Sequence, residues 1–485
     1  MKSIAERVLG LLPSSVAYAD VRVVRRRHDG IHVENQDVRQ VLTEESEGIG
    51  LRVLLNGQWG FAATPRLDAR GLQAGVRRAV DQARAAEGLG PPITLAPSPP
   101  HQERFATPVQ RDPFGVPFAA KVELLLEAAN SILRAGGSRV VAEASMDFFR
   151  DEKLFASTEG ACIEQTIVES GAGLMATAAN GSDVQRRSYP QGVPRAIRGQ
   201  RGDFATAGYE HIEGLDLASA APRVGEEAAA LLSAHPCPAV TTTLIVGGAQ
   251  MAQLIHETAG HPSELDRTAG AEASLSGGTY LEPTSRGRQR FGSDLVTIVA
   301  DATLPGGLGS FGFDDDGVAA HRSVLVDHGT FVGYLSSRQS AAGLGVPSSG
   351  AARADGWSRV PLVRMTNVSL EPGDSDLEEM ITSTDDGVLM DLNRSMSIDD
   401  RRLSFRFGCE IGWEIKRGRL GRLLKDCTFS GISPQFWARC DAVANLSSYR
   451  LYGIPSCNKG EPLQVAHIGH GTVPARFRDV SIGAR

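Results

Sequence analysis

Hydrophobic and polar residues alternate along the chain between Ala19 and Ala63, as they do in strands that bury one face. Two dipeptides, Asp29-Gly30 and Asn56-Gly57, interrupt the alternation, and both favour tight turns because glycine accepts positive φ. The pattern predicts a meander of antiparallel strands with turns at these two places. Its apolar positions are Val21, Val23, Ile31, Val33, Leu51, Val53 and Leu55.

Helical periodicity replaces the alternation in four further segments. Apolar residues recur every three or four positions at the start of the chain, near 66–87, near 117–134 and near 215–233, which predicts a helix in each segment. Residues 88–117 hold eight of the 25 prolines, so we expect a long surface loop there. Strand-like patterns return at 138–149 and 162–176.

The pattern changes after Ala234-His235-Pro236-Cys237-Pro238, where we place the main domain boundary. Short β-type runs separated by turns rich in Gly or Asp then predominate, and few long helical patterns follow residue 258. The sequence therefore predicts an α+β protein with two domains. Residues 1–235 would form an α/β domain of antiparallel strands and flanking helices, and residues 236–485 a mostly β, barrel-like domain that carries one important helix.

Composition and charge exclude some classes of partner and favour one kind of cellular compartment. The chain has 485 residues, with 50 Lys plus Arg against 57 Asp plus Glu, so its formal charge is −7, and we expect no nucleic-acid partner. We also expect no membrane span, because uninterrupted apolar stretches of about 18 residues are missing from the sequence. Six scattered cysteines without a Cys-x-x-Cys motif suit a reducing compartment, and Glu6 and Arg7 interrupt any secretory signal. We therefore expect a cytoplasmic protein.

Candidate chemistry lies at the end of the helix expected over Gly248–Ala259. His256 and His261 flank Glu257 in a pattern close to the zinc-peptidase signature, in which two histidines bind the metal and the intervening Glu is the base. That signature spaces its histidines by four residues, however, and a spacing of five places them about 140° apart on a regular helix. Both could reach one ion only if Gly260 unwinds the helix end or if the last turn widens into a π-helix.

A catalytic zinc ion requires three protein ligands and an open position. By residue type the candidates for the third ligand are Glu264, Cys457, His467 and His470. Cys457 lies in a segment rich in Gly and Pro, which we expect to be a loop able to present a thiolate. The alternative is that Cys457 is an inert buried thiol.

Two other motifs carry less weight. Gly307–Gly312 matches the dinucleotide fingerprint, but Pro305 precedes it and an acidic run follows it, so we expect a turn and no cofactor other than a metal. Asp314-Asp315-Asp316-Gly317 lacks the alternating spacing of a calcium loop, and we expect a solvated turn or a backbone anchor.

Several of these segments together resemble the TldD side of the TldD/PmbA family. They are His256–Glu264, the Asp314–Gly317 run, Arg364-Met365-Thr366-Asn367, Gly408–Leu424 with the Cys457 segment and, more loosely, Gly48–Phe61. The most specific element is the histidine spacing coupled to a late cysteine. The segment after Ser456 and the presence of His467 and His470 depart from the commoner family pattern, which places the chain in a diverged subgroup.

The resemblance implies a site and a reaction. By position, His256, His261 and Cys457 would bind one zinc ion per subunit, and Glu257 would be the general base of a metallopeptidase. A bound zinc ion lowers the pKa of its water from 15.7 toward ~7, and Glu257 would carry that water's proton to the leaving amine. Glu264 would orient a ligand imidazole, and His467 or His470 would stabilise the oxyanion or support a ligand from behind.

The resemblance also implies substrates and partners. We expect short or unfolded peptides as substrates, and a dimer formed either with a paralogous subunit that lacks the motif or with a second copy. The alternative is a partner or adaptor subunit without catalysis, in which a closed site with a fourth protein ligand would make the zinc structural.

Overall fold

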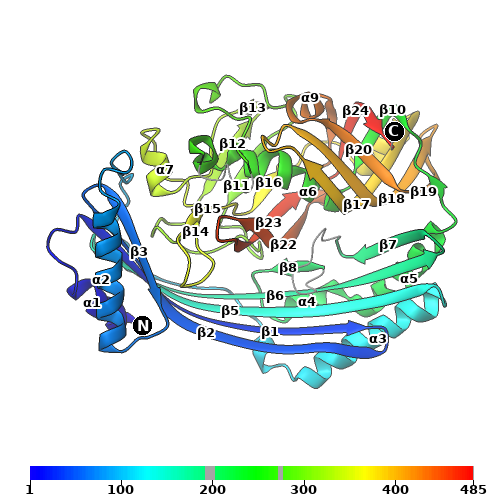
Figure 1. Cartoon of the computed structure of the whole chain (residues 1–485). Coiled ribbons are helices and arrows are strands. Elements are labelled where there is room, and N and C mark those ends of the chain that lie inside the picture. The colour runs from blue at the N-terminus through cyan, green and yellow to red at the C-terminus, as the bar shows by residue number, and fades with distance from the viewer. Residues whose placement is uncertain (192–201, 271–276, 484–485) are drawn as a thin grey trace.

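The computed structural model describes residues 1–191, 202–270 and 277–483. Long strands build the first half of the chain into one sheet with the order β3-β2-β1-β5-β6-β4, and β7 and β8 pair with β6 as well. Its strands are β1 (Tyr18–Glu34), β2 (Asp37–Leu55), β3 (Gln58–Thr64), β4 (Arg104–Ala106), β5 (Val140–Ser157), β6 (Cys162–Asn180), β7 (Asp183–Tyr189) and β8 (Asp203–Ala205). β1, β2, β5 and β6 form a long curved platform (Figure 1).

The predicted meander is confirmed, but one of its turns was misplaced. Asn56 and Gly57 do form the β2–β3 turn, with φ of 50° and 75°. The turn expected at Asp29-Gly30 is wrong, because β1 runs through both residues and turns only after Glu34. Gly30 serves close packing instead, since a Cβ there would lie 3.0 Å from Oδ1 of Asp147.

Helices cover the far face and one end of this platform. α3 (Phe118–Gly136) and α5 (Leu217–Leu231) pack beneath β5 and β6, and α1 (Lys2–Gly10) and α2 (Ala69–Ala85) pack on β1, β2 and β3 (Figure 1). All four helices were predicted, and each buries the apolar face that its periodicity defines. The loop predicted at 88–117 is also present, interrupted only by β4 and a 3₁₀ turn, η1 (Pro113–Gly115).

The second half contains a closed five-stranded barrel. β17, β10, β24, β20 and β18 follow one another in the sheet, and β17 also pairs with β18, which closes the ring. These strands are β10 (Val240–Val246), β17 (Asp386–Ile398), β18 (Ser404–Lys416), β20 (Cys427–Ile432) and β24 (Ala475–Ile482). Stacked aromatic rings fill part of its core, with Phe436 and Phe477 4.3 Å apart. The α+β class and the barrel-like second half are confirmed, whereas the division at 235/236 stays a prediction.

Shorter elements complete the second half. They are strands β9 (His235–Pro236), β11 (Ile298–Asp301), β12 (Arg322–Asp327), β13 (Thr330–Phe331), β14 (Ala352–Arg353), β15 (Leu362–Val363), β16 (Val368–Leu370), β19 (Arg419–Lys425), β21 (Cys440–Val443), β22 (Arg450–Lys459) and β23 (Gln464–Thr472). The helices are α4 (Glu210–Leu215), α6 (Gly248–Ile255), α7 (Arg338–Ala342), α8 (Leu377–Thr382) and α9 (Ser433–Ala438), and the single turns are η3 (His256–Gly260), η4 (His261–Ser263), η5 (Leu265–Ala269), η6 (Pro283–Ser285) and η7 (Leu446–Ser448).

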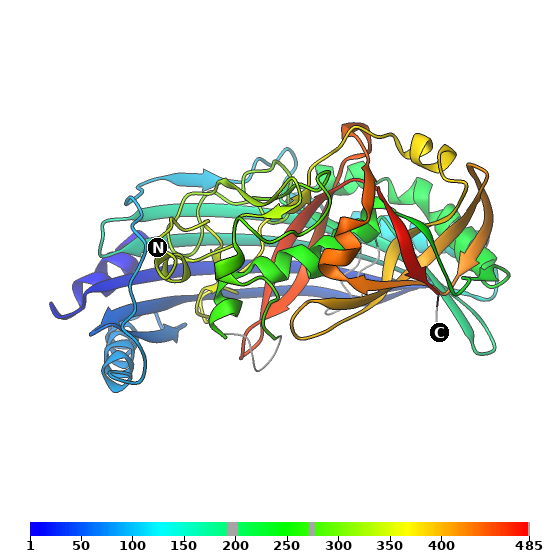
Figure 2. The ribbon, with the colours of Figure 1, turned by 90° about the horizontal axis from the view of Figure 1, so that it is seen from above.

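The two halves lie against each other along the platform. The C-terminal half packs on the concave face, opposite α3 and α5 (Figure 1), and covers the long strands when viewed from above (Figure 2). The hairpin of β22 and β23 lies between the barrel and the platform (Figure 1). In the described part of the chain, every helix is too short or too polar to cross a bilayer.

The Asp314–Gly317 run is a backbone anchor between the two halves. Asp314 is buried, and its carboxylate accepts the N–H groups of Asp316, Val318 and Ala352 at 2.9 to 3.0 Å. Asp316 binds the guanidinium of Arg52, on β2, at 2.7 Å. The interpretation as a solvated turn is therefore wrong, because each carboxylate has a partner in the interior.

Candidate metal centre

The end of α6 widens into one turn of π-helix, η3, which contains both candidate histidines. The N–H of His261 donates to the carbonyl of His256, five residues earlier, so residues five apart face the same side. The two imidazoles are stacked edge to face with centroids 4.8 Å apart. Of the two geometries that the spacing allowed, the π-helix is the one that forms, and Gly260 keeps a right-handed φ of −61°.

Close packing and hydroxyl groups hold this turn in place. A Cβ on Gly260 would lie 2.1 Å from Sδ of Met365, so glycine is needed for space and not for a left-handed backbone. The hydroxyl of Thr258 donates to the carbonyl of Leu254 at 2.6 Å and accepts the indole N–H of the buried Trp437 at 3.0 Å. Trp437 lies on α9 against the barrel, so the barrel fixes the position of the turn.

Cys457 completes a compact cluster with the two histidines. Its Sγ lies 3.6 Å from Nε2 of His256 and 3.7 Å from Nε2 of His261, and the three ligand atoms all lie within 4.8 Å of one another. Tetrahedral zinc with Zn–S of about 2.3 Å and Zn–N of about 2.05 Å would separate sulfur from nitrogen by roughly 3.6 Å. The donor set and its spacing therefore fit a zinc ion.

Cys457 lies on a strand and not in the loop that its Gly- and Pro-rich surroundings predicted. It belongs to β22 and pairs with Ala466 of β23. The pairing is interrupted between Ile454 and Cys457, where Pro455 has no N–H to donate, and resumes at Cys457. The bulge therefore sets the direction of the thiol, and the strand fixes it.

His470 contacts Nδ1 of His256, the ring nitrogen that does not face Cys457. The ring of His470 lies in β23, with Nδ1 2.8 Å from the carbonyl of Val368 and Nε2 3.1 Å from Nδ1 of His256. A carbonyl only accepts, so Nδ1 of His470 carries a proton and its Nε2 accepts one from Nδ1 of His256. Nε2 of His256 is then left with a lone pair that faces Cys457. Burial lowers the pKa of both imidazoles, which keeps them neutral as this arrangement requires.

Glu264 contacts Nδ1 of His261, as His470 contacts Nδ1 of His256. Oε2 of Glu264 lies 3.0 Å from Nδ1 of His261 and accepts Nε of Arg267 at 2.7 Å, and Nζ of Lys459 lies 3.3 Å away. Burial alone would raise the pKa of Glu264, but Lys459 and Arg267 hold it well below its usual range. An ionised carboxylate draws the imidazole proton to Nδ1, which leaves the lone pair on Nε2. Glu264 thus contacts the opposite side of the imidazole from Cys457.

Glu257 lies beside the cluster with its two oxygens in different environments. Oε1 is 3.9 Å from Nε2 of His256 and 3.5 Å from Nε2 of Gln253. Oε2 accepts a hydrogen bond from Nη1 of Arg402, a buried residue in the turn between β17 and β18. One oxygen is anchored by Arg402, and the other lies beside the cluster of His256, His261 and Cys457. Sequence reasoning missed Arg402, which lies 145 positions from Glu257.

His467 contacts a different part of the molecule. It lies three residues before His470 on β23, and an odd spacing puts two side chains on opposite faces of a strand. Its Nδ1 lies against the carboxylate of Glu169, on β6, and its ring packs edge-on against Phe149 at 4.7 Å. The structure therefore brings His470 and Glu264 to the cluster and turns His467 toward the platform.

Family models cover most of this chain in three consecutive parts. Residues 19–86 match domain 1 of the PmbA/TldA metallopeptidases, residues 111–235 their central domain, and residues 240–476 their C-terminal domain. The chain belongs to the PmbA/TldA metallopeptidase family. The resemblance found in the sequence is thereby confirmed, and the cluster at η3 lies within the C-terminal domain of that family.

Individual family members agree with this assignment. A metalloprotease from Methanothermobacter thermautotrophicus is 30% identical over 469 residues, which covers 96% of each chain. A metalloprotease TldD homolog from Haemophilus influenzae is 24% identical over 97% of this chain and 93% of its own. A zinc metalloprotease TldD homolog from Saccharolobus solfataricus is 26% identical over 44% of this chain and 46% of its own.

Solved structures show the same fold. A protein from Thermotoga maritima, described as a modulator of a DNA gyrase, superposes with a TM-score of 0.78 at 16% identity and covers 99% of this chain and 100% of its own. TldE from Thermococcus kodakarensis superposes with a TM-score of 0.71 at 17% identity and full coverage of both chains.

Proposed function

We propose that this chain is a zinc-dependent peptidase that hydrolyses short or unfolded peptides. The single observation that carries the proposal is the cluster of His256, His261 and Cys457, whose sulfur-to-nitrogen distances of 3.6 and 3.7 Å match tetrahedral zinc. The zinc metalloprotease name of a relative supports the choice of metal. When bound, zinc supplies an acidified water molecule and a charge that polarises the peptide carbonyl.

The residues of the cluster and those around it have different proposed roles. Among the described residues, His256, His261 and Cys457 would take three ligand positions and would leave a fourth position open. His470 and Glu264 hold the ligand imidazoles in the tautomers that present Nε2. Arg402 anchors one oxygen of Glu257, and the other oxygen takes a proton from the attacking water and delivers it to the leaving amine. This arrangement disfavours the adaptor role, which needs a fourth protein ligand.

The likeness to TldE supports a dimer, formed with a paralogous subunit or with a second copy of this chain. All six cysteines are free, including the five outside the cluster, which supports a reducing compartment such as the cytoplasm. One zinc ion per subunit is proposed.

The function is tested by measuring zinc content and hydrolysis of an unfolded peptide in parallel. Wild type should carry one zinc ion per chain and lose hydrolysis on chelation, and zinc should restore it. Cys457→Ser should lose both, whereas Cys440→Ser, which alters an equally buried cysteine on β21, should lose neither. Full zinc content in Cys457→Ser would refute the ligand set.

A further inference from the structure

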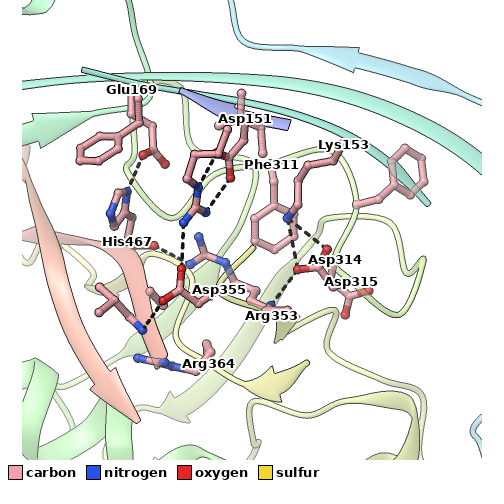
Figure 3. A pocket seen from close by; sticks show the side chains of 17 residues that line it. Asp151, Lys153, Glu169, Phe311, Asp314, Asp315, Arg353, Asp355, Arg364 and His467 are labelled. Carbon is pink, nitrogen blue, oxygen red and sulfur yellow. Dashed lines mark hydrogen bonds and ion pairs between the residues drawn. The ribbon is translucent and has the colours of Figure 1, made fainter. Parts of the chain in front are cut away.

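A cavity lies between the platform and the C-terminal half (Figure 3). It is lined by residues of β1, β5 and β6, by the loop at 311–315, and by β14 and β23. Its volume is about 60 Å³, which is room for about four or five water molecules or one small organic group. Phe149, Phe311 and Phe313 form apolar walls.

The carboxylates of this lining already have partners. Asp151 and Asp355 both bind Arg26, at 2.7 and 2.8 Å, and Asp315 binds Lys153 at 3.0 Å (Figure 3). Glu169 lies against His467. Burial and the neighbouring Asp316 hold the pKa of Asp314 well above its usual range, and its oxygens already accept three backbone N–H groups.

The two remaining cations of the lining donate hydrogen bonds to carbonyl groups, and the guanidinium of Arg353 also lies over the ring of Phe311, 5.4 Å from its centroid. Arg353 donates from Nη1 to the carbonyls of Met365 and His467, at 3.2 and 2.5 Å. Arg364, which is 1% exposed, donates to the carbonyls of Gln464 and Cys457, at 3.2 and 2.5 Å. Among the described residues, neither guanidinium has a carboxylate within ion-pair distance, and Nε of Arg364 is buried without any hydrogen-bond acceptor.

Such an arrangement has a physical cost that an anion would offset. A buried charge without a counter-charge destabilises a protein, and carbonyl groups compensate a guanidinium only in part. Arg353 keeps Nε and Nη2 available on one edge, and that edge matches the two oxygens of a carboxylate. The lining already carries four paired carboxylates, Asp151, Asp315, Asp355 and Glu169, so the single charge of a carboxylate suits the cavity better than the double charge of a phosphate or sulfate dianion.

We propose that this cavity binds a carboxylate carried on a compact apolar group, with Arg353 as its main partner and Arg364 as the second. The carboxylate lies against the Arg353 edge, and the apolar group packs on the phenylalanine walls. Arg364 also donates to the carbonyl of Cys457, so one side chain links the cavity to the metal cluster. A free carboxylic acid and the C-terminal carboxylate of a peptide both have this chemistry, and the second source rests on the proposed peptidase function.

The binding itself is tested without any peptidase activity. Ligand-observed NMR on the full chain should detect propionate but not propionamide, which has the same shape without the charge. Arg353→Gln should weaken propionate binding at least tenfold, Arg353→Lys should retain part of it, and Arg422→Gln, an exposed arginine on β19, should retain all of it. Equal binding of propionate and propionamide to wild type would overturn the proposal, as would propionate binding that Arg353→Gln leaves unchanged.

A second arm distinguishes the two sources of carboxylate. If the ligand is a peptide terminus, hydrolysis of a peptide with a free C-terminus should show a KM at least tenfold lower than that of its amidated form, and Arg353→Gln should abolish the difference at unchanged kcat. Equal KM values together with propionate binding would assign the cavity to a free acid. If no peptide is hydrolysed at all, the proposed function fails, while the NMR comparison still decides whether the cavity binds carboxylate.

Discussion

Nδ1 of His256 lies 3.1 Å from Nε2 of His470, and this contact determines which nitrogen of His256 can face a metal ion. His470 is itself fixed by the carbonyl of Val368 at 2.8 Å. The chain of carbonyl, His470 and His256 therefore directs the lone pair on Nε2 of His256 toward Cys457. Replacing His470 would remove the group that accepts the Nδ1 proton of His256, and both tautomers of His256 would then be accessible.

We expect His470→Ala to lower zinc affinity by about 10 to 100-fold, the usual effect of removing a group that orients a metal ligand. Competition with a chromophoric chelator measures it. His467→Ala is the matched control, because His467 lies on the other face of the same strand and contacts Glu169. Equal zinc affinities in the two variants would contradict the role given to His470.

The packing of Met365 against Gly260 predicts a stability effect. Gly260→Ala should destabilise the protein by about 1 to 3 kcal/mol, because the new methyl group would meet Sδ of Met365 at 2.1 Å. Urea unfolding measures the change. Gly214→Ala, in α4, is the control: nothing lies within 4 Å of the added methyl group, so the free energy of unfolding should not fall. Adding Met365→Ala to Gly260→Ala should show a favourable coupling energy between the two substitutions.

Asp203 makes stability depend on pH. Burial raises the pKa of Asp203 to about 7, although its Oδ1 accepts the N–H of Gly453 on β22 at 2.7 Å. A folded pKa above the unfolded value means that stability is present at low pH and is lost as pH rises through about 4 to 7.

Replacing Asp203 by Asn should therefore change the free energy of unfolding differently at the two ends of this range. The variant's free energy of unfolding relative to wild type should be higher at pH 8 than at pH 5 by about 2 to 3 kcal/mol. Urea unfolding of both proteins at the two pH values tests this. If the two proteins differed in free energy of unfolding by the same amount at pH 5 and at pH 8, Asp203 would be ionised in the folded protein at both pH values.

Arg402 is expected to act through Glu257. Arg402→Met should lower kcat by about 100-fold at unchanged zinc content, because the carboxylate loses the guanidinium that fixes Oε2. Arg402→Lys should recover part of kcat, and Arg401→Met, whose side chain is 64% exposed, should change nothing. If Arg402→Met raised KM alone, Arg402 would bind substrate and would not position the base.

Local patterns in the sequence determine much of this fold. The alternation of Val21, Val23, Leu51 and Val53 predicted the platform strands, and the spacing of Leu72, Val76 and Val80 predicted α2, because burial of one face imposes a period on each element. Asp29-Gly30 failed as a turn, since β1 continues through both residues and Gly30 packs closely against Asp147 on another strand.

The site could be predicted only in part, for the same physical reason. The spacing of His256 and His261 limited the local geometry to two alternatives, but the close contact that leaves room only for glycine at position 260 comes from Met365, distant in the sequence. Contacts of Glu257 with Arg402 and of His467 with Glu169 depend on how strands pair across the molecule. No periodicity encodes such contacts.

The catalytic role of Glu257 is tested most directly by a paired measurement on Glu257→Gln. Gln keeps the size of the side chain but cannot accept a proton from the attacking water. Zinc content and peptide hydrolysis are measured on one preparation each of wild type and variant. We predict one zinc ion per chain in both and a loss of hydrolysis of at least 100-fold in the variant. Hydrolysis at the wild-type rate in a zinc-loaded Glu257→Gln would show that Glu257 is not the base.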